Sequence, residues 1–117
     1  MSYVDGFVVA VPTANRDAYR QQALTARMVF RDHGAQRCVE CWGDDVPDGK
    51  VTSFPMAAKK ADDETVVFSW IGWPSRAARD AGMAAAMQDP RMPQDMSEMP
   101  FDGQRMIFGG FAPIVDI

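Results

Sequence analysis

The sequence predicts an α+β domain built from two strand-helix-strand units in succession. The first observation is a pair of strongly apolar segments, Tyr3–Val11 and Glu64–Trp73, rich in β-branched and aromatic residues. The second is that a segment with helical periodicity follows each of them, at Asn15–His33 and Ser75–Met87. With 117 residues the chain has the length of one domain, which we expect to span 1–117.

In the first unit, Pro12 ends the first strand, because proline donates no ladder hydrogen bond. The helix that follows carries apolar residues at spacings of three and four, and Gly34 is placed to end it in a left-handed conformation. A more polar strand comes next, at Arg37–Asp44. The residues that make one helical face are Tyr19, Ala23, Ala26, Phe30 and His33. Four arginines fall mostly on the other side: Arg16, Arg20, Arg27 and Arg31.

The second unit begins after a long arm, residues 45–63, which opens with turn-forming residues and contains a short helix near Pro55. After the second, alanine-rich helix comes a Met-rich segment, 89–104, that we expect to hold another short helix. The last strand is predicted at Arg105–Val115. Its Gly109-Gly110 pair indicates a bulge or a close approach of backbone.

The polarity of the strands predicts their order in the sheet. The first and third strands are apolar on both faces and belong in its centre, whereas the second is the most polar and belongs at an edge. Right-handed crossovers then give the antiparallel order 4-1-3-2, which is the ferredoxin-like βαββαβ arrangement.

Two helices cover only one face of such a sheet, yet both central strands are apolar on both faces. The uncovered face would be an apolar surface too large for a monomer to expose to water. We therefore expect a homodimer that pairs sheet against sheet; the alternative is that the arm at 45–63 folds back over its own sheet. Because successive residues of a strand point to opposite faces, the apolar residues of the two strands divide into two sets. One face carries Tyr3, Phe7, Val9, Val11, Val67, Ile71 and Trp73, and the other carries Val4, Val8, Ala10, Val66, Phe68 and Trp70.

Charge and hydropathy exclude several classes of partner. The formal net charge is -4 and no basic run is present, so we expect no nucleic-acid binding. No apolar segment approaches the roughly 20 residues that span a bilayer, and the first residues lack the basic region of a secretory signal. The expectation is a cytoplasmic protein with no membrane partner.

Four segments resemble the YbaA-like family of small bacterial proteins of unknown function. The resemblance runs from end to end, with departures at Gly72-Trp73-Pro74 and at Pro93. The family is similar to the dimeric α/β barrel proteins, which are ferredoxin-like domains paired sheet on sheet, so the resemblance implies the same dimer. It brings no catalytic residues. The matching segments are Tyr3–Phe7, Asp44–Pro55, Asp63–Ile71 and Met99–Phe111.

Few residues are candidates for acid-base chemistry. His33 is the only histidine, and it is a candidate general base because its side chain titrates near neutrality. A structural role against the negative end of its helix is the alternative. Glu40 and Asp5 are candidate proton carriers if they point inward, because burial raises a carboxyl pKa. The alternative for both is an ion pair with an arginine such as Arg37 or Arg105.

Cys38 and Cys41 match the C-x-x-C spacing of redox and metal sites. Residues three apart on a strand point to opposite faces, so the two thiols should diverge. We therefore expect two ordinary cysteines, no metal site and no cofactor.

The sequence leaves two functional hypotheses open and does not decide whether the protein is an enzyme. In the first, it binds or transforms a small apolar or aromatic molecule in a flat, apolar pocket between the sheet and the second helix. In the second, it is a non-catalytic homodimer that acts as a protein-interaction module through Met92, Met96 and Met99. The candidate pocket lining of the first hypothesis is Trp42, Phe68, Trp70, Trp73, Met83 and Met87.

Overall fold

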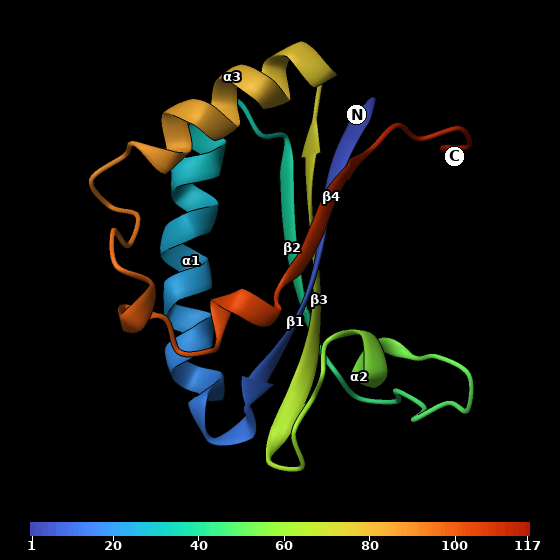
Figure 1. The fold of residues 1–117 in the computed structure, drawn as a ribbon. Helices are drawn as coiled ribbons and strands as arrows, with labels where there is room; N and C mark the ends of the chain where they lie inside the picture. The colour runs from blue at the N-terminus through green and yellow to red at the C-terminus, as the bar shows by residue number, and fades with distance from the viewer.

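A four-stranded antiparallel sheet with helices on both sides forms the architecture of the computed structural model, which describes residues 1–117 (Figure 1). The strand order is β2-β3-β1-β4, so the predicted α+β class and order are confirmed. The elements are β1 (Tyr3–Pro12), α1 (Arg16–Asp32), β2 (Arg37–Trp42), α2 (Phe54–Ala57), β3 (Glu64–Trp73), α3 (Arg76–Met87) and β4 (Ile107–Phe111), with 3-10 turns at Thr13–Asn15, Met96–Glu98 and Gly103–Arg105.

The helices begin and end where their capping residues dictate. The Ser53 and Ser75 hydroxyls accept hydrogen bonds from the third residue beyond, at 3.1 and 3.0 Å, and so cap α2 and α3. Gly34 follows α1 with a φ of 108°, the positive value that glycine adopts without strain. None of the helices is long and apolar enough to cross a membrane.

Two elements differ from the prediction. The Met-rich segment contains one 3-10 turn, Met96–Glu98, in place of a short helix. Pro93 explains this, because it removes a backbone donor that the helix needs after its first turn. The last strand is also shorter, Ile107–Phe111, and ends before Pro113.

The core on the α1 side of the sheet consists of two separate clusters. One joins the end of α1 to β3 and α3 and contains Val29, Phe30, Ile71, Trp73 and Ala86. The other lies at the start of α1 and contains Val9, Val11, Val67 and Phe101, with Tyr19, Trp42, Met99 and Met106 packed around it. Each fully buried aliphatic or aromatic side chain contributes about 1.5–3 kcal/mol, so α1 is held at both ends.

Polar groups join the sheet to α3 inside the first cluster. The Trp73 indole donates a hydrogen bond to Asp5 at 2.9 Å, and Arg79 from α3 donates one to the Tyr3 hydroxyl at 2.8 Å. Gly110 on β4 lies against Arg79 and Tyr3, where a Cβ atom would collide with both. The predicted bulge or close approach of backbone at the glycine pair is absent, since the register with β1 is continuous and the neighbours of Gly110 are side chains.

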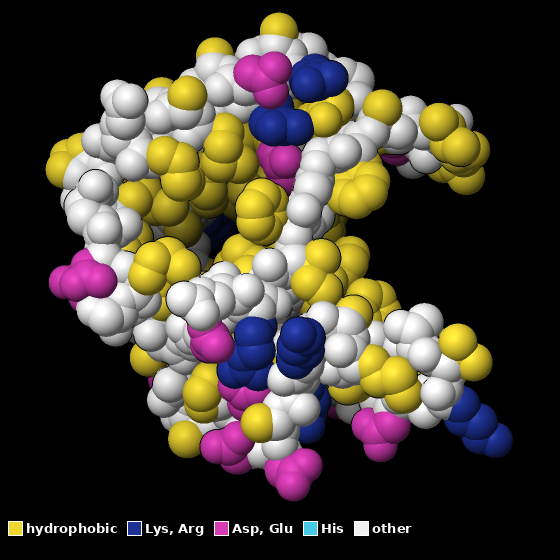
Figure 2. Space-filling view, in the orientation of Figure 1, with side chains coloured by type: hydrophobic (Ala, Val, Ile, Leu, Met, Phe, Trp, Pro, Cys, Tyr) yellow, Lys and Arg dark blue, Asp and Glu magenta, His cyan; other side chains and the backbone are white.

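The opposite face of the sheet is only partly covered. α2 and the rest of the arm lie over one end of it, where the Phe54 ring packs edge-on against Phe68 at 6.1 Å. Ala10 and Val66 are buried beneath this end. Phe68, at the margin of the arm, is still 44% exposed. Beyond the arm, the side chains of Ile107 and Phe111 are 42 and 62% exposed. Figure 2 shows a notch on this side, bordered by hydrophobic side chains of the arm and of the C-terminal tail.

We predict that Gly82→Ala destabilises the fold by about 1–3 kcal/mol, through overpacking. A Cβ at Gly82 would collide with the Trp73 ring and with the His33 carbonyl oxygen. Helix propensity alone would make the same change stabilising by about 1 kcal/mol. Urea unfolding separates the two, and a variant more stable than the parent would refute the packing argument.

We also predict that Glu64 contributes to the stability of the fold and that this contribution depends on pH. This buried carboxylate accepts two hydrogen bonds from Arg105, at 2.8 and 2.7 Å, and these hold its pKa below the ordinary 4.5. Because the folded state depresses the pKa, the stabilisation is present above pH 4.5 and is lost as the pH falls through the lower folded value.

Glu64→Gln should therefore cost about 1–3 kcal/mol at pH 7. In urea unfolding, the difference in the free energy of unfolding between variant and parent should become smaller below pH 4. A difference that is the same at pH 3 and pH 7 would contradict the assignment.

Candidate functional site

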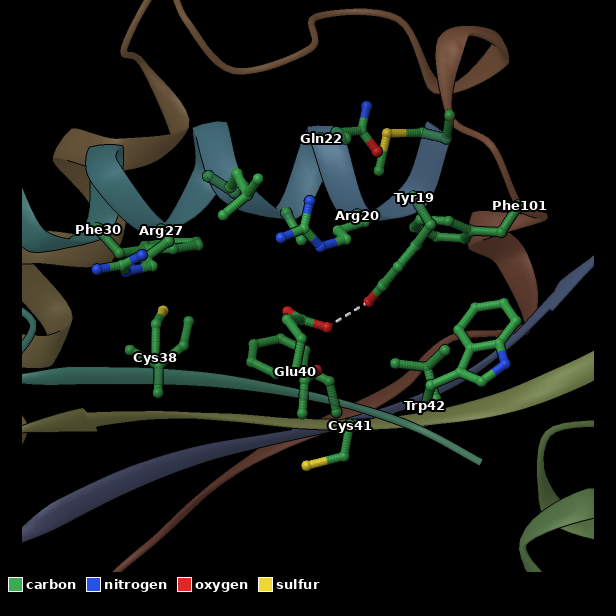
Figure 3. Close-up of a pocket in the computed structure, with 18 of the residues that line it drawn as sticks. Tyr19, Arg20, Gln22, Arg27, Phe30, Cys38, Glu40, Cys41, Trp42 and Phe101 are labelled. Atoms are coloured by element: carbon green, nitrogen blue, oxygen red, sulfur yellow. Dashed lines mark hydrogen bonds between the residues drawn. The ribbon is translucent and has the colours of Figure 1, made fainter. Parts of the chain in front are cut away.

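A cavity of about 440 Å³ lies between α1 and the sheet, in the space that separates the two core clusters (Figure 3). Hydrophobic side chains make up most of its wall. α1 contributes one side, β2 and β3 contribute the floor, and the Met-rich segment closes the remaining side through Met92, Pro93 and Met99. This size and lining are typical of a site for a small organic molecule.

The cavity exists because small residues occupy the middle of α1. Between Tyr19 and Phe30, which reach the two clusters, the residues in the middle of the apolar face of the helix are Ala23 and Ala26. Alanine side chains are too short to meet the floor below them. The ends of α1 are therefore packed while its centre stands away from the sheet.

Glu40, Tyr19 and Ser69 form the polar centre of the cavity. The Tyr19 hydroxyl donates a hydrogen bond of 2.5 Å to Glu40 Oε1, and Figure 3 shows the two side chains pointing toward each other across the cavity. Glu40 comes from β2 and Ser69 is its cross-strand partner on β3. The group is thus held by one helix and two neighbouring strands.

Burial raises the pKa of the Glu40 carboxyl, while hydrogen bonds from Tyr19 and Ser69 lower it in part. Glu40 is nonetheless exposed to solvent, because its side chain faces the open cavity while protein surrounds it on the other sides. Burial and the nearby Glu40 charge also raise the pKa of the Tyr19 phenol. The pair is a carboxyl that holds its proton more tightly than usual next to a phenol that stays protonated.

The two cysteines lie on opposite faces of β2. Cys38 pairs with Ile71 on the cavity side, and Cys41 pairs with Phe68 on the far side. The predicted divergence of the thiols is confirmed. Burial raises the pKa of Cys38 to about 11, so its sulfur remains a thiol and is a poor nucleophile. No three His, Cys, Asp or Glu side chains come together in a way that could hold a metal ion.

The three candidate acid-base residues have different surroundings in the structure. Glu40 lies in the cavity, whereas His33 and Asp5 do not line it. His33, at the end of α1, is 3.0 Å from the Asp89 carboxylate, which also pairs with Arg91. Asp5 is buried between Trp73 and Arg79 rather than next to Arg37 or Arg105. Both residues have structural partners that account for their positions.

The six residues expected to line an aromatic pocket do not lie together, because neighbouring residues of a strand point to opposite faces of the sheet. Of its six residues only Trp42 lines the cavity. Phe68 and Trp70 point to the far face, where Arg37 stacks on Trp70 at 5.3 Å. Trp73 is fully buried and Met83 packs against it in the first cluster, while Met87 is half exposed on α3. The helix that covers the cavity is the first one, not the second.

Several cavity residues were not identified by sequence reasoning. Tyr19 was assigned to an apolar helical face, and the signal that could have marked it is its hydroxyl, which needs a partner when buried. Arg16, Arg20 and Arg27 line the cavity, although the helical pattern placed them mostly on the other side. They lie on the flank of that face, and their long side chains reach around it.

The whole chain is similar to bacterial proteins without an assigned function. It is 58% identical over 116 residues to the uncharacterized protein YbaA of Escherichia coli (strain K12), covering 99% of each chain. The uncharacterized protein YbaA of Escherichia coli O157:H7 and that of Shigella flexneri match to the same extent. The expected resemblance to a YbaA-like family is confirmed.

A family model described as "Protein of unknown function (DUF1428)" matches residues 2–103. This range contains α1, β2 and β3, and with them the whole polar centre of the cavity. The chain belongs to this DUF1428 family of proteins of unknown function.

Proposed function

We propose that the protein binds a small, mainly apolar molecule in the cavity between α1 and the sheet. The single observation that carries this proposal is the cavity itself, a volume of about 440 Å³ with an apolar wall and one polar centre. Such a volume in the middle of a small core forgoes packing that the fold could use, because filled interiors are more stable. A ligand that fills it restores those contacts.

Glu40 and Tyr19 supply the polar contact of the proposed ligand. A protonated or ionised carboxyl can respectively donate to or accept from a ligand hydroxyl or carbonyl group. Because burial raises its pKa, the Glu40 carboxyl keeps its proton more readily than a free glutamate does, which favours donation of a hydrogen bond to a bound molecule. The Met-rich segment belongs to this site, because Met92 and Met99 line the cavity and Met96 alone of the three predicted contact residues is exposed.

The proposed assembly is a homodimer of ferredoxin-like domains joined through the open face of the sheet, which would make a dimeric α/β barrel. The strand order is compatible with such a domain. On this face the strands carry only two charged residues, Glu64 under the arm and Arg37. A second copy offers the same apolar surface, so a two-fold axis would pair like with like.

The C-terminal tail supports a second copy as the occupant of this face. Ile114, Val115 and Ile117 are almost fully exposed and lie on the same side of the sheet as the arm. Nothing in their own chain covers these side chains. The notch between tail and arm in Figure 2 is open to a partner sheet, whose own tail and arm would project in the opposite direction.

For the cavity, we predict that the neutral probe 1-naphthylmethanol raises Tm in a dose-dependent way, because it binds the folded state. Ala26→Leu places a larger side chain in the cavity and should abolish the shift while raising the melting temperature of the free protein. Ala18→Leu, at an exposed position of α1 outside the cavity wall, is the matched control and should leave the shift unchanged. An equal shift in Ala26→Leu would place the probe elsewhere and contradict the proposal.

For the assembly, light scattering should give a mass of twice 12.9 kDa at micromolar concentration. Phe111→Glu puts a charge on the open face and should yield a monomer, whereas Phe108→Glu, on the other face of the same strand, should stay dimeric. The two phenylalanines are similarly exposed, at 62 and 73%, so the pair isolates the face that is used. A monomeric parent would rule the dimer out.

A further inference from the structure

The arginines of this protein divide into two groups. Five have a carboxylate within 4.0 Å: Arg31, Arg76, Arg79, Arg91 and Arg105. The other four have none, and three of these, Arg16, Arg20 and Arg27, line the cavity. The fourth, Arg37, lies on the opposite face against Trp70. The arginines without a carboxylate partner are therefore concentrated at the cavity, whereas the lysines without one, Lys50, Lys59 and Lys60, all lie in the arm.

This concentration runs against the overall charge. The chain carries a formal net charge of -4, yet the charged side chains of the cavity wall are three arginines and one glutamate. Even with Glu40 ionised, the wall is net positive. An apolar cavity strengthens electrostatic attraction within it, because its effective dielectric constant is lower than that of water.

Arg20 and Arg27 are the arginines available to a ligand. Figure 3 shows both guanidinium groups pointing from α1 toward the sheet, into the space above Glu40 and Cys38. They are seven residues apart and so lie two turns apart on one side of the helix. Arg16 is already engaged, because its guanidinium lies 5.8 Å from the centre of the Trp42 ring.

We infer that the cavity takes a small organic acid, with its carboxylate at Arg20 or Arg27 and its apolar body against Phe30, Ile71 and Met92. This inference rests on the proposed function and names its ligand class. The guanidinium fork matches the geometry of a carboxylate, which a neutral ligand lacks. A single negative charge is favoured over a phosphate dianion, because Glu40 lies in the same cavity.

The test compares two probes of the same shape by isothermal titration calorimetry, 1-naphthoate and the neutral 1-naphthylmethanol. The parent protein should bind the acid at least about tenfold more tightly than the alcohol, as a charge-assisted contact requires. The preference should weaken in high salt, which screens the attraction. Equal affinity for the two probes would overturn the inference.

Three matched variants show which arginine causes the preference for the acid over the alcohol. One of Arg20→Gln and Arg27→Gln should lose most of it and thereby identify the arginine that binds the carboxylate, whereas Arg37→Gln, which removes the same charge from the far face, should keep it. Glutamine has nearly the helix propensity of arginine, so α1 should stay folded, and circular dichroism checks this. A preference that survives in both cavity variants would also overturn the inference.

The outcomes separate this inference from the proposed function. If the alcohol binds and the acid binds no better, the cavity is a binding site without selection for anions, and only the inference fails. If neither probe binds the parent protein, the proposed function fails and the inference with it.

Discussion

The constraint on which the rest of this structure depends is the way α1 is held above the sheet. Large side chains anchor its two ends, Tyr19 against Phe101 and Phe30 against Trp73. On the apolar face between them, Ala23 and Ala26 are too small to reach the strands. A helix is stiff over this length, so packing at both ends keeps its centre away from the sheet and preserves the cavity.

The cavity then determines the chemistry of the groups around it. Glu40 would be an ordinary edge-strand carboxylate if α1 lay closer or were absent. Under the helix it meets the Tyr19 hydroxyl, and the surrounding protein raises its pKa although the side chain stays exposed to solvent through the open cavity. The arginines on the flank of α1 reach the same space, so one apolar volume brings together a proton donor and unpaired cations.

The fold itself could be predicted from the sequence because it depends on local patterns. The apolar runs of β1 and β3, the caps at Ser75 and Gly34, and the greater polarity of β2 are each visible in a short window. Handedness rules convert them into a strand order. The Met-rich segment could not be predicted in the same way, since its spacing resembles a helix while Pro93 removes a backbone donor that a helix needs.

The candidate site depended on a different kind of information. By itself the sequence determined which residues share a strand face or a helix face, and it named Glu40 and Trp42 among the candidates. Only the tertiary structure decided which face lies under α1 and that Tyr19, Arg20 and Arg27 join Glu40 there. The physical reason is that a cavity is the space between elements distant in the sequence, and its size depends on how closely whole helices and sheets approach, which no local pattern encodes.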